Sequence, residues 1–484
     1  MLWRGRAFLA KGGKQFSTKA SCPVATLRAC NLVADTTSEK LADVLQAKRE
    51  GDGGSLTPSV YVGFDPTARS LHVGNLVSIR ALQAFQAHGF RPIALVGGAT
   101  GFIGDPSGKR ADRVLLDNSE LAKNQSGIEA CLRQVLSFSS DGSGGGNSAK
   151  LVNNIDWYEN MSAFEFVRDI GQHFRVSQMM GRESVKQRLA SEVGISYTEF
   201  SYQMFQAYDF FHLCDKENCV LQIGGSDQWG NIASGIDFIR RKYSQGVDEG
   251  ASDRQAYGLT VPLLTTSSGE KFGKSAGNAV WLDPSMTSPF EFYQYFMQAS
   301  DADAAHLVPM LAIDLSRPHG NEGTYSLSRA REVLVEHAQD PGKRYAQKFL
   351  ADSLTSWVHG SDALENARLA TETLFKKTPK SNGDSAEDVA RHLRQLLEND
   401  SIELVEVSRT DLEHSTVVEL AALTGAVKSK GEAKRLVKNG GLYLNQKRVQ
   451  DVNQSFRLLE DTVEDNLCTL RVGRKKQVVI KIVE

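Results

Sequence analysis

The sequence predicts an α/β protein in which a doubly wound parallel sheet is followed by an α-helical part and a small α+β module. Two observations carry this prediction. Apolar runs at residues 60–64 and 92–96 have the length of buried strands and enclose a helical pattern from Gly74 to His88. A strand, a helix and a strand in this order form a parallel pair. After Pro284, strand signals become rare and helical patterns run to about Lys377.

The parallel sheet is predicted to continue beyond this first unit. Residues 151–152 and 220–223 are further short apolar runs, each followed by the Asn or Gly residues that commonly end strands. Helical patterns at 163–174 and 202–211 occupy the connections between them. The Ser- and Gly-rich run at 139–148 predicts an exposed insertion rather than a helix or strand.

The bulk composition is that of a globular chain with several domains. Its 484 residues exceed what one compact core holds. The formal net charge of -2 means that any RNA site must come from locally concentrated charge. No pair among the six cysteines has CxxC spacing, which predicts reduced thiols and no metal site. No apolar run approaches the roughly 20 residues that cross a bilayer, so no membrane association is predicted.

The N-terminal residues 1–34 have the composition of an organelle transit peptide. No acidic residue precedes Asp35, whereas Lys, Arg and hydroxyl side chains are frequent. The apolar segment of a secretory signal is missing. A disordered basic tail is the alternative interpretation of the same composition.

The end of the first predicted strand has the features of a phosphate site. Residues 61–75 read YVGFDPTARSLHVGN, so a turn at Pro66 leads to a helix that begins just after His72. Free N–H groups and the positive end of the helix dipole attract phosphate there. His72 can donate to phosphate oxygens, and Gly74 lets a flat base approach the backbone. A lone His at a helix start is more often a capping or core residue.

A second motif lies about two hundred residues later. Lys271 and Lys274 are three residues apart in the glycine-containing run KFGKS. Two mobile ammonium groups can stabilise pyrophosphate as negative charge develops on it. Taken alone, the run is more often a solvated basic loop.

Together the two motifs resemble the HIGH and KMSKS signatures of class I aminoacyl-tRNA synthetases. Three further segments narrow the resemblance to bacterial-type tyrosyl-tRNA synthetases: LVGGATGFIGDPSGK at 95–109, YQMFQAYDF at 202–210 and QIGGSDQWGN at 222–231. The resemblance extends from about Asp35 to the C-terminus. It implies that the sheet is the Rossmann-like catalytic domain of this family.

The resemblance implies a pocket that binds tyrosine through six side chains. Tyr61 and Asp209 would hydrogen-bond the phenolic hydroxyl. A phenylalanine substrate would leave both unpaired, which costs free energy in a buried site. Four more residues would bind the other end of the amino acid, the first three at its ammonium group and the last near its carboxyl group: Asp105, Tyr202, Gln206 and Gln228.

The resemblance also implies an ATP site. The residues that would act catalytically on the phosphates are Thr67, His72, Lys271 and Lys274. The residues that would contact ATP are Asp65, His72, Gly74, Asn75, Gly225, Asp227 and Lys274. Asn75 replaces the second His of HIGH, which keeps a hydrogen-bond donor and predicts altered ATP affinity. Lys109 and Arg113 resemble the family's other cationic loop. Mg²⁺ would arrive with ATP, with no protein-bound metal or prosthetic group.

The C-terminal residues carry a local excess of positive charge. From His414 to Glu484 there are 13 Lys and Arg against 8 Asp and Glu, which suits contacts with RNA phosphates. The run EAKRLVKNGGLYLN at 432–445 resembles an S4-type RNA-binding domain. This resemblance implies RNA contacts by Lys434, Arg435 and Lys438, although a solvated charged helix would have the same composition.

These predictions divide the chain into five parts. They are a mitochondrial transit peptide, a Rossmann-like catalytic domain with the KFGKS loop, an α-helical anticodon-side domain, a linker and an S4-like domain, at 1–34, 35–284, 285–377, 378–413 and 414–484. The implied activity is activation of L-tyrosine with ATP and its transfer to tRNA-Tyr, by a homodimer in the mitochondrial matrix. The tryptophanyl relative is an alternative, but it has no use for a Tyr61 and Asp209 pair around a phenol. An RNA-binding or intron-splicing factor on a synthetase scaffold is another.

Overall fold

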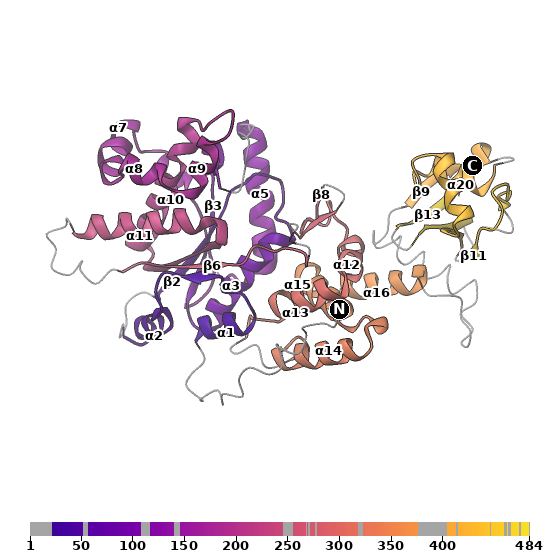
Figure 1. Ribbon diagram of the computed structural model, residues 1–484, viewed down its shortest axis with the longest axis horizontal. Coiled ribbons are helices and arrows are strands. Elements are labelled where there is room, and N and C mark those ends of the chain that lie inside the picture. Colours follow the sequence, from indigo (N-terminus) through magenta and orange to yellow (C-terminus); the bar gives the residue numbers. More distant parts are fainter. Residues whose placement is uncertain are drawn as a thin grey trace.

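A computed structural model of the chain describes residues 22–51, 57–107, 117–139, 146–244, 255–267, 269, 272–275, 278–317, 323–375, 404–412, 415–445, 447–458, 462, 466–473 and 476–483. Figure 1 shows an α/β part, a group of helices beside it and a small C-terminal module. Within these residues, no helix combines the length and the apolar composition that a membrane crossing requires.

The α/β part is built on a six-stranded sheet with strand order β1-β6-β5-β2-β3-β4. All neighbouring strands are parallel except the β1–β6 pair. Chain order runs outward from β2 in both directions, so β2 and β5 flank the switch point where ligands bind in doubly wound sheets. The strands are β1 Asp35–Thr36, β2 Ser59–Phe64, β3 Arg91–Val96, β4 Lys150–Asn153, β5 Cys219–Gly225 and β6 Tyr257–Val261.

Alternation along the strands sends side chains into two separate layers. Val60 and Val62 belong to the large core cluster on the face covered by α3 (Leu76–Ala87) and α5 (Asn118–Val135). Tyr61 belongs to a second cluster, with residues of α10 (Tyr197–Lys216) and α11 (Trp229–Ser244). Because successive residues of a strand face opposite sides, the sequence position of Tyr61 alone directs it toward α10.

The helix expected at 163–174 is wrong as a single element. This stretch is divided into α7 (Ala163–Glu165), the π-helical turn η3 (Phe166–Ile170) and the 3₁₀ turn η4 (Gly171–His173). Two short helices follow, α8 (Val176–Met180) and α9 (Glu183–Leu189). The expected helix 202–211 is longer than predicted. It begins after Ser196, whose side chain accepts a hydrogen bond from the Glu199 N–H and so caps α10.

The end of the predicted transit peptide lies inside the folded part. Helix α1 (Pro23–Ala29) packs against α3 and precedes α2 (Leu41–Gly51). The side chains of Val24, Leu27 and Leu32 are completely buried in the large core cluster. A leader that ended at residue 34 would take this helix with it. Residues 1–21 lie outside the described part.

The helical part begins at Pro289, as predicted. Ser288 and Glu291 form a reciprocal capping box at the start of its first helix. The large core cluster is continuous from the sheet into this part, so the predicted boundary at residue 284 marks a change of architecture within one core. The helices are α12 Pro289–Met297, α13 Asp301–Leu311, α14 Leu327–Gln339, α15 Tyr345–His359 and α16 Ser361–Phe375.

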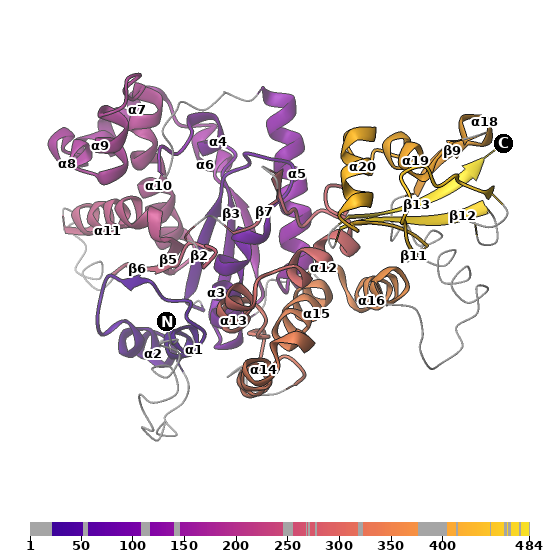
Figure 2. The ribbon, with the colours of Figure 1, turned by 45° about the vertical axis from the view of Figure 1, so that its right-hand side comes forward.

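The C-terminal module contains a five-stranded sheet with strand order β11-β10-β12-β13-β9. Strand β9 lies within the predicted linker 378–413 and pairs in parallel with β13, so the prediction ended the linker too late. Figure 2 shows the module beyond α16, whose Ala370 and Leu374 contact Leu467 and Val479 of its sheet. Its elements are β9 Leu404–Ser408, α18 Arg409–Leu412, α19 Val417–Leu423, α20 Lys430–Lys438, β10 Leu442–Leu444, β11 Lys447–Arg448, β12 Leu467–Val472 and β13 Lys476–Val483.

Candidate active site

A cavity of about 430 Å³ opens at the C-terminal ends of β2 and β5, beside α10. It lies where the strand order predicts a ligand crevice. Most of the predicted tyrosine- and ATP-binding residues line this one cavity, although they come from four separate segments of the chain. They are Tyr61, Asp65, Thr67, His72, Gly74, Asn75, Asp105, Tyr202, Gln206, Asp209, Gly225, Asp227 and Gln228.

The remaining predicted residues lie elsewhere or outside the described part. Lys271, Lys109 and Arg113 are outside it. Lys274 opens the short strand β7 (Lys274–Ser275), which pairs with β8 (Asn278–Ala279), and its side chain is not described. The three predicted RNA-binding residues are exposed on α20 of the C-terminal module: Lys434, Arg435 and Lys438.

Tyr61 presents a buried hydroxyl group to the cavity. Its side chain is 1% exposed and packs on Phe210 with ring centroids 5.3 Å apart. The hydroxyl has no hydrogen-bond partner within the described residues. Burial raises its pKa well above the ordinary value, and the charge of Asp209 adds to the increase, so the group stays protonated. A buried hydroxyl without a partner costs about 1–3 kcal/mol, a cost that a polar ligand group would remove.

Asp209 supplies a carboxylate at the same end of the cavity. One oxygen accepts a hydrogen bond from Asn154 Nδ2 at 3.1 Å and the other from Trp157 Nε1 at 2.9 Å. Burial raises the pKa of Asp209 to about 7, and these hydrogen bonds oppose the increase. Asn154 and Trp157 therefore fix the orientation of the carboxylate, and burial raises its pKa toward neutrality.

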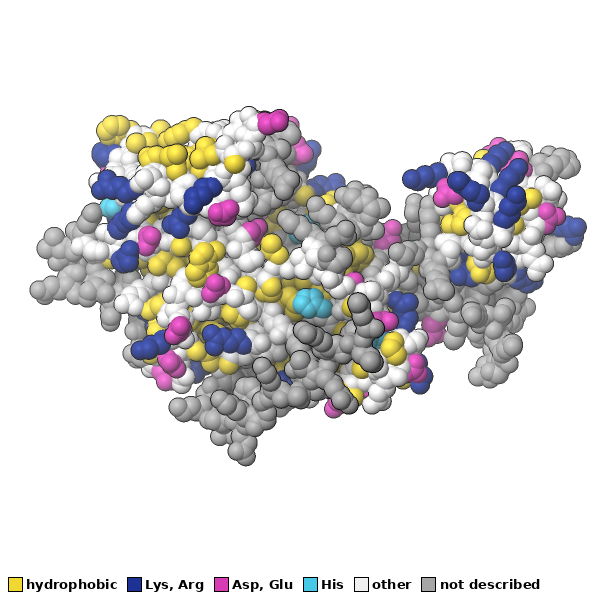
Figure 3. Space-filling model, viewed as in Figure 1, with side chains coloured by type: hydrophobic (Ala, Val, Ile, Leu, Met, Phe, Trp, Pro, Cys, Tyr) yellow, Lys and Arg dark blue, Asp and Glu magenta, His cyan; other side chains and the backbone are white. Residues whose placement is uncertain are grey.

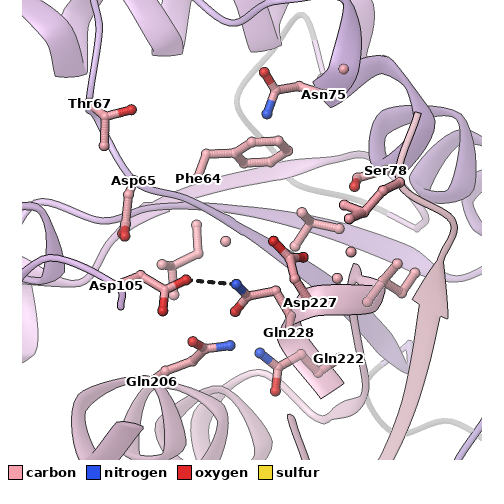
Figure 4. Close-up of a pocket in the computed structure, with 18 of the residues that line it drawn as sticks. Phe64, Asp65, Thr67, Asn75, Ser78, Asp105, Gln206, Gln222, Asp227 and Gln228 are labelled. Atoms are coloured by element: carbon pink, nitrogen blue, oxygen red, sulfur yellow. Dashed lines mark hydrogen bonds between the residues drawn. The ribbon is translucent and has the colours of Figure 1, made fainter. Parts of the chain in front are cut away.

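A group of hydrogen-bond acceptors surrounds Asp105. Its carboxylate accepts hydrogen bonds from Gln228 Nε2 at 2.7 Å and from the Ser107 N–H at 2.9 Å. The Oε1 atoms of Gln206 and Gln222 are buried without hydrogen-bond partners among the described residues. Figure 4 shows the four side chains together on one side of the cavity. A carboxylate beside two unpartnered carbonyl oxygens is suited to an ammonium group.

The structure joins two residues for which sequence comparison implied separate roles. The hydroxyl of Tyr202 donates to Asp65 Oδ2 at 2.9 Å, and Thr100 Oγ1 donates to Asp65 Oδ1 at 2.7 Å. A Cβ atom at Gly97 would overlap the Asp65 carboxylate. The glycine after β3 is therefore required for Asp65 to sit between the strand ends.

The opposite end of the cavity is built from backbone caps. His72 precedes the 3₁₀ turn η2 (Val73–Asn75); its Nδ1 accepts from the Gly74 N–H at 3.0 Å, and Asn75 Oδ1 accepts from the His72 N–H at 3.0 Å. A Cβ atom at Gly74 would come within 2.8 Å of the imidazole ring, so glycine is needed for the ring to fold back. In Figure 4 the amide nitrogen of Asn75 points toward the interior of the cavity.

The centre of the KFGKS run is attached to the helical part. Phe272 is 9% exposed and packs edge-on against Tyr295 of α12, with ring centroids 5.1 Å apart. The N–H of Gly273 donates to the Tyr295 hydroxyl at 2.8 Å. A Cβ atom at Gly273 would lie 3.5 Å from the Gly74 nitrogen, so the run also touches the His72 cap. In the sequence, Lys271 and Lys274 therefore flank a segment that contacts Tyr295 of α12 on one side and the turn at His72 on the other.

Thr100 and Gln222 line the cavity, and Asn154 and Trp157 donate hydrogen bonds to Asp209; none of these was among the predicted site residues. A polar Gln222 inside a buried strand was a usable signal, because buried polar groups need partners. Asn154 follows β4 at a strand end, which was suggestive. Trp157 carries no local signal. Within the described residues, no three His, Cys, Asp or Glu side chains gather as metal ligands.

Comparison with known proteins gives consistent matches over most of the chain. Residues 56–376 match the family model "tRNA synthetases class I (W and Y)", and residues 385–480 match "Tyrosine--tRNA ligase SYY-like C-terminal domain". The tyrosine–tRNA ligase of Rhodopirellula baltica is 42% identical over 88% of this chain and 90% of its own length.

Two solved structures have a similar fold. A C-terminally truncated mitochondrial tyrosyl-tRNA synthetase of Aspergillus nidulans superposes with a TM-score of 0.63 at 29% identity, over 74% of this chain and 95% of its own. The corresponding structure from Coccidioides posadasii gives 0.58 at 31% identity, over 72% and 91%. Both superpositions cover more than nine-tenths of the solved chains.

Proposed function

Because this chain belongs to the class I tyrosyl-tRNA synthetases, we propose that its cavity binds L-tyrosine at the end formed by Tyr61 and Asp209 and ATP at the end formed by His72. The chain is a tyrosine–tRNA ligase. Its substrates are tyrosine, ATP and tRNA-Tyr, and its products include AMP and pyrophosphate. The proposal concerns which residues carry out each part of this reaction.

The unpartnered Tyr61 hydroxyl is the observation that carries the tyrosine assignment. With Asp209 it offers a donor and an acceptor to one phenolic hydroxyl, and both would lose their partner if phenylalanine bound. Asp105 and the free carbonyl oxygens of Gln206 and Gln222 take the ammonium group. The family resemblance implied that Tyr202 contacts the ammonium group directly. In this proposal Tyr202 instead positions Asp65 through a hydrogen bond from its hydroxyl.

Tyrosine bound in this way directs its carboxylate toward the α-phosphate of ATP. The carboxylate oxygen attacks phosphorus, the bond to the β-phosphate oxygen breaks and pyrophosphate leaves. A terminal ribose hydroxyl of tRNA then attacks the tyrosyl carbonyl and AMP leaves. The protein contributes position and charge. Thr67, His72, Lys271 and Lys274 stabilise the phosphates, while ATP enters as its Mg²⁺ complex, the magnesium being part of the substrate.

The test of this assignment is tyrosine-dependent ATP–pyrophosphate exchange. Exchange should proceed with tyrosine and be negligible with phenylalanine or tryptophan at equal concentration. Charging of a tRNA-Tyr transcript should follow with the same preparation. Exchange that runs equally well with tryptophan would contradict the assignment of Tyr61 and Asp209.

We infer that the protein is a homodimer through the surface formed by α7, α8 and α9. Large apolar side chains there are strongly exposed, among them Phe164 of α7 at 70% and Val176 of α8 at 60%. Figure 3 shows hydrophobic side chains gathered over this end of the molecule. Monomers seldom expose extended apolar patches. Val167→Asp should yield monomers in analytical ultracentrifugation, whereas Leu423→Asp, an exposed apolar position on α19, should leave the dimer intact.

We also infer that the enzyme works in the mitochondrial matrix, with a leader confined to residues 1–21. Two observations support this: the basic, acid-free N-terminal composition and the mitochondrial origin of the two structural relatives. The burial of Val24 and Leu27 favours a leader that ends before Pro23. Fusing residues 1–21 to a fluorescent protein should direct it to mitochondria, and a fusion that begins at Cys22 should stay in the cytosol.

The alternative of an RNA-binding or intron-splicing factor on a synthetase scaffold is not favoured. The matched relatives are named as tyrosine–tRNA ligases over most of the chain. The C-terminal module, with Lys434, Arg435 and Lys438 exposed on α20, is proposed to serve tRNA-Tyr.

A further inference from the structure

The C-terminal sheet has a row of three side chains that the proposed function does not use. Strand register sets Tyr443 of β10 directly opposite Arg448 of β11 on one side and Arg471 of β12 on the other. Directly opposed residues of antiparallel strands share a face. The neighbours of Tyr443 in β10, Leu442 and Leu444, are buried in the module core. Tyr443 is half-buried and faces away from that core.

Arg471 is held flat against the Tyr443 ring. Its guanidinium carbon lies 3.7 Å from the ring centroid, and Nη1 donates to the Gly473 carbonyl at 3.3 Å. Among the described residues, no carboxylate forms an ion pair with Arg471 or Arg448. The ring therefore positions a planar cation whose charge no carboxylate in the described part of the chain neutralises.

Arg448 extends this row to the end of α20. It is exposed, and a Cβ atom at Gly440 would overlap its guanidinium group. Gly440 has a φ of +69°, so glycine is required there both for backbone conformation and for space. Lys438, the last residue of α20, lies two residues before this turn. Figure 3 shows Lys and Arg side chains across the visible face of the module.

We propose that Arg448, Tyr443 and Arg471 form a stacking site for an unpaired nucleotide of RNA. The base stacks on the Arg471 guanidinium plane, which Tyr443 holds in place, and Arg448 contacts an adjacent phosphate. Unpaired bases stack on aromatic rings and on Arg guanidinium planes, whereas paired bases do not present their faces. A surface that bound phosphate alone would need charge but no ring. The proposal rests on the proposed function only in naming tRNA-Tyr as the RNA.

The test compares variants of the full chain by their affinity for a tRNA-Tyr transcript, measured by fluorescence anisotropy. Tyr443→Leu and Arg471→Lys keep the net charge and remove the stacked pair, and each should raise Kd by about 5- to 100-fold with little change in salt dependence. Arg448→Ala should reduce the slope of log Kd against log salt by about one. Tyr443→Phe keeps the ring and should keep the affinity.

Lys447→Ala is the matched control. Lys447 is the exposed neighbour of Arg448 in β11 and its register partner is Leu444, so it belongs to the other face of the sheet. It should change Kd less than threefold. If Arg471→Lys retains full affinity, or if Tyr443→Leu has no more effect than Lys447→Ala, the stacking site is refuted and only a phosphate surface remains.

Exchange activity separates this proposal from the proposed function. All of these variants should support normal tyrosine-dependent ATP–pyrophosphate exchange, because the row belongs to a different sheet from the cavity. If the unaltered chain showed no exchange, the proposed roles of the cavity residues would be wrong. The comparison of tRNA-Tyr affinities among the C-terminal variants would still be valid. Loss of exchange in Tyr443→Leu alone would overturn the stacking site, since it would mean that the change acts on the fold.

Discussion

The two ends of the cavity are constructed in different ways. At the Tyr61 end, side chains from β2 and α10 are buried, and Asp209 of α10 accepts hydrogen bonds from Asn154 at 3.1 Å and from Trp157 at 2.9 Å. At the His72 end, backbone N–H groups, glycines and caps form the wall. Figure 4 shows Thr67 and Asn75 on one side of the cavity and Gln206 and Gln222 on the other.

This difference corresponds to two chemical tasks. Recognising one hydroxyl group requires donors and acceptors that cannot move to suit a wrong ligand, and buried networks provide such rigidity. Stabilising charge on a departing pyrophosphate requires groups that bind more strongly in the transition state than before it. We therefore expect changes at the Tyr61 end to alter selection and changes at the His72 end to alter rate.

The largest effect should come from Asp209→Ala. The variant loses the phenol acceptor and leaves the donors of Asn154 and Trp157 unpaired. We expect kcat/KM for tyrosine in ATP–pyrophosphate exchange to fall on the order of 10²–10³-fold, with KM for ATP almost unchanged. If the kinetic parameters for tyrosine and for ATP changed by the same factor, the two ends of the cavity would not have the separate roles assigned to them.

Lys274→Ala should have the opposite signature. We expect adenylate formation to slow by about 10²-fold, the cost of losing one group that stabilises transition-state charge. Tyrosine affinity, measured by equilibrium dialysis, should stay within twofold of the unaltered enzyme. Lys481→Ala, on β13 of the C-terminal sheet, is a control for a general charge effect and should not change the rate.

The pH dependence of tyrosine binding should identify Asp209. Its pKa is raised to about 7, so the carboxylate that accepts the phenol is increasingly protonated below neutrality. We expect the Kd for tyrosine to be constant above pH 8 and to rise about tenfold per pH unit below 7. Asp209→Asn should bind more weakly and without this dependence. A flat profile in the unaltered enzyme would show that Asp209 is not the acceptor.

The same titration affects stability. The folded-state pKa of Asp209 lies above the ordinary value of 3.8, so the folded protein holds a proton that the unfolded chain releases between about pH 4 and 7. The resulting contribution to the free energy of unfolding is fully present below pH 4 and is lost as pH rises through 7. Asp209→Asn should therefore gain stability relative to the unaltered enzyme as pH increases, in urea unfolding at pH 5 and pH 8.

The smallest effect should come from Tyr295→Phe. It removes the acceptor for the Gly273 N–H and keeps the packing with Phe272. One such hydrogen bond contributes about 1 kcal/mol, so we expect a few-fold decrease in kcat and no change in KM for tyrosine. A larger effect on KM for tyrosine than on kcat would show that the KFGKS run supports the Tyr61 end of the cavity and not the His72 end.

Sequence patterns predicted the parts of the site that lie on single segments. Tyr61 was assigned through the family resemblance of its motif, and His72 through the strand-to-helix turn together with that resemblance. The supports of Asp65 and Asp209 were not predictable in this way, since Thr100 and Trp157 reach them from 35 and 52 residues away along the chain. Tertiary packing also decided the division of 163–174 into short turns, where a helical pattern alone favoured one helix.

The end of the predicted leader is a second point that composition alone does not determine. Composition favoured a transit peptide as far as residue 34, because acidic residues are missing up to that point. Leu27 and Leu32 are nevertheless completely buried. A short apolar helix without acidic residues has the same composition whether it is a leader or part of a core, and only the groove beside α3 distinguishes the two.

The placement of α1 beneath α3 matters for how the enzyme is produced in the laboratory. A recombinant version that starts at Asp35 would lack the buried side chains of Val24, Leu27 and Leu32 and would present a bare apolar groove to the solvent. Such a protein would aggregate during purification, and its inactivity would be mistaken for a catalytic defect. A version that starts at Cys22 retains the whole helix and keeps the core beside α3 filled.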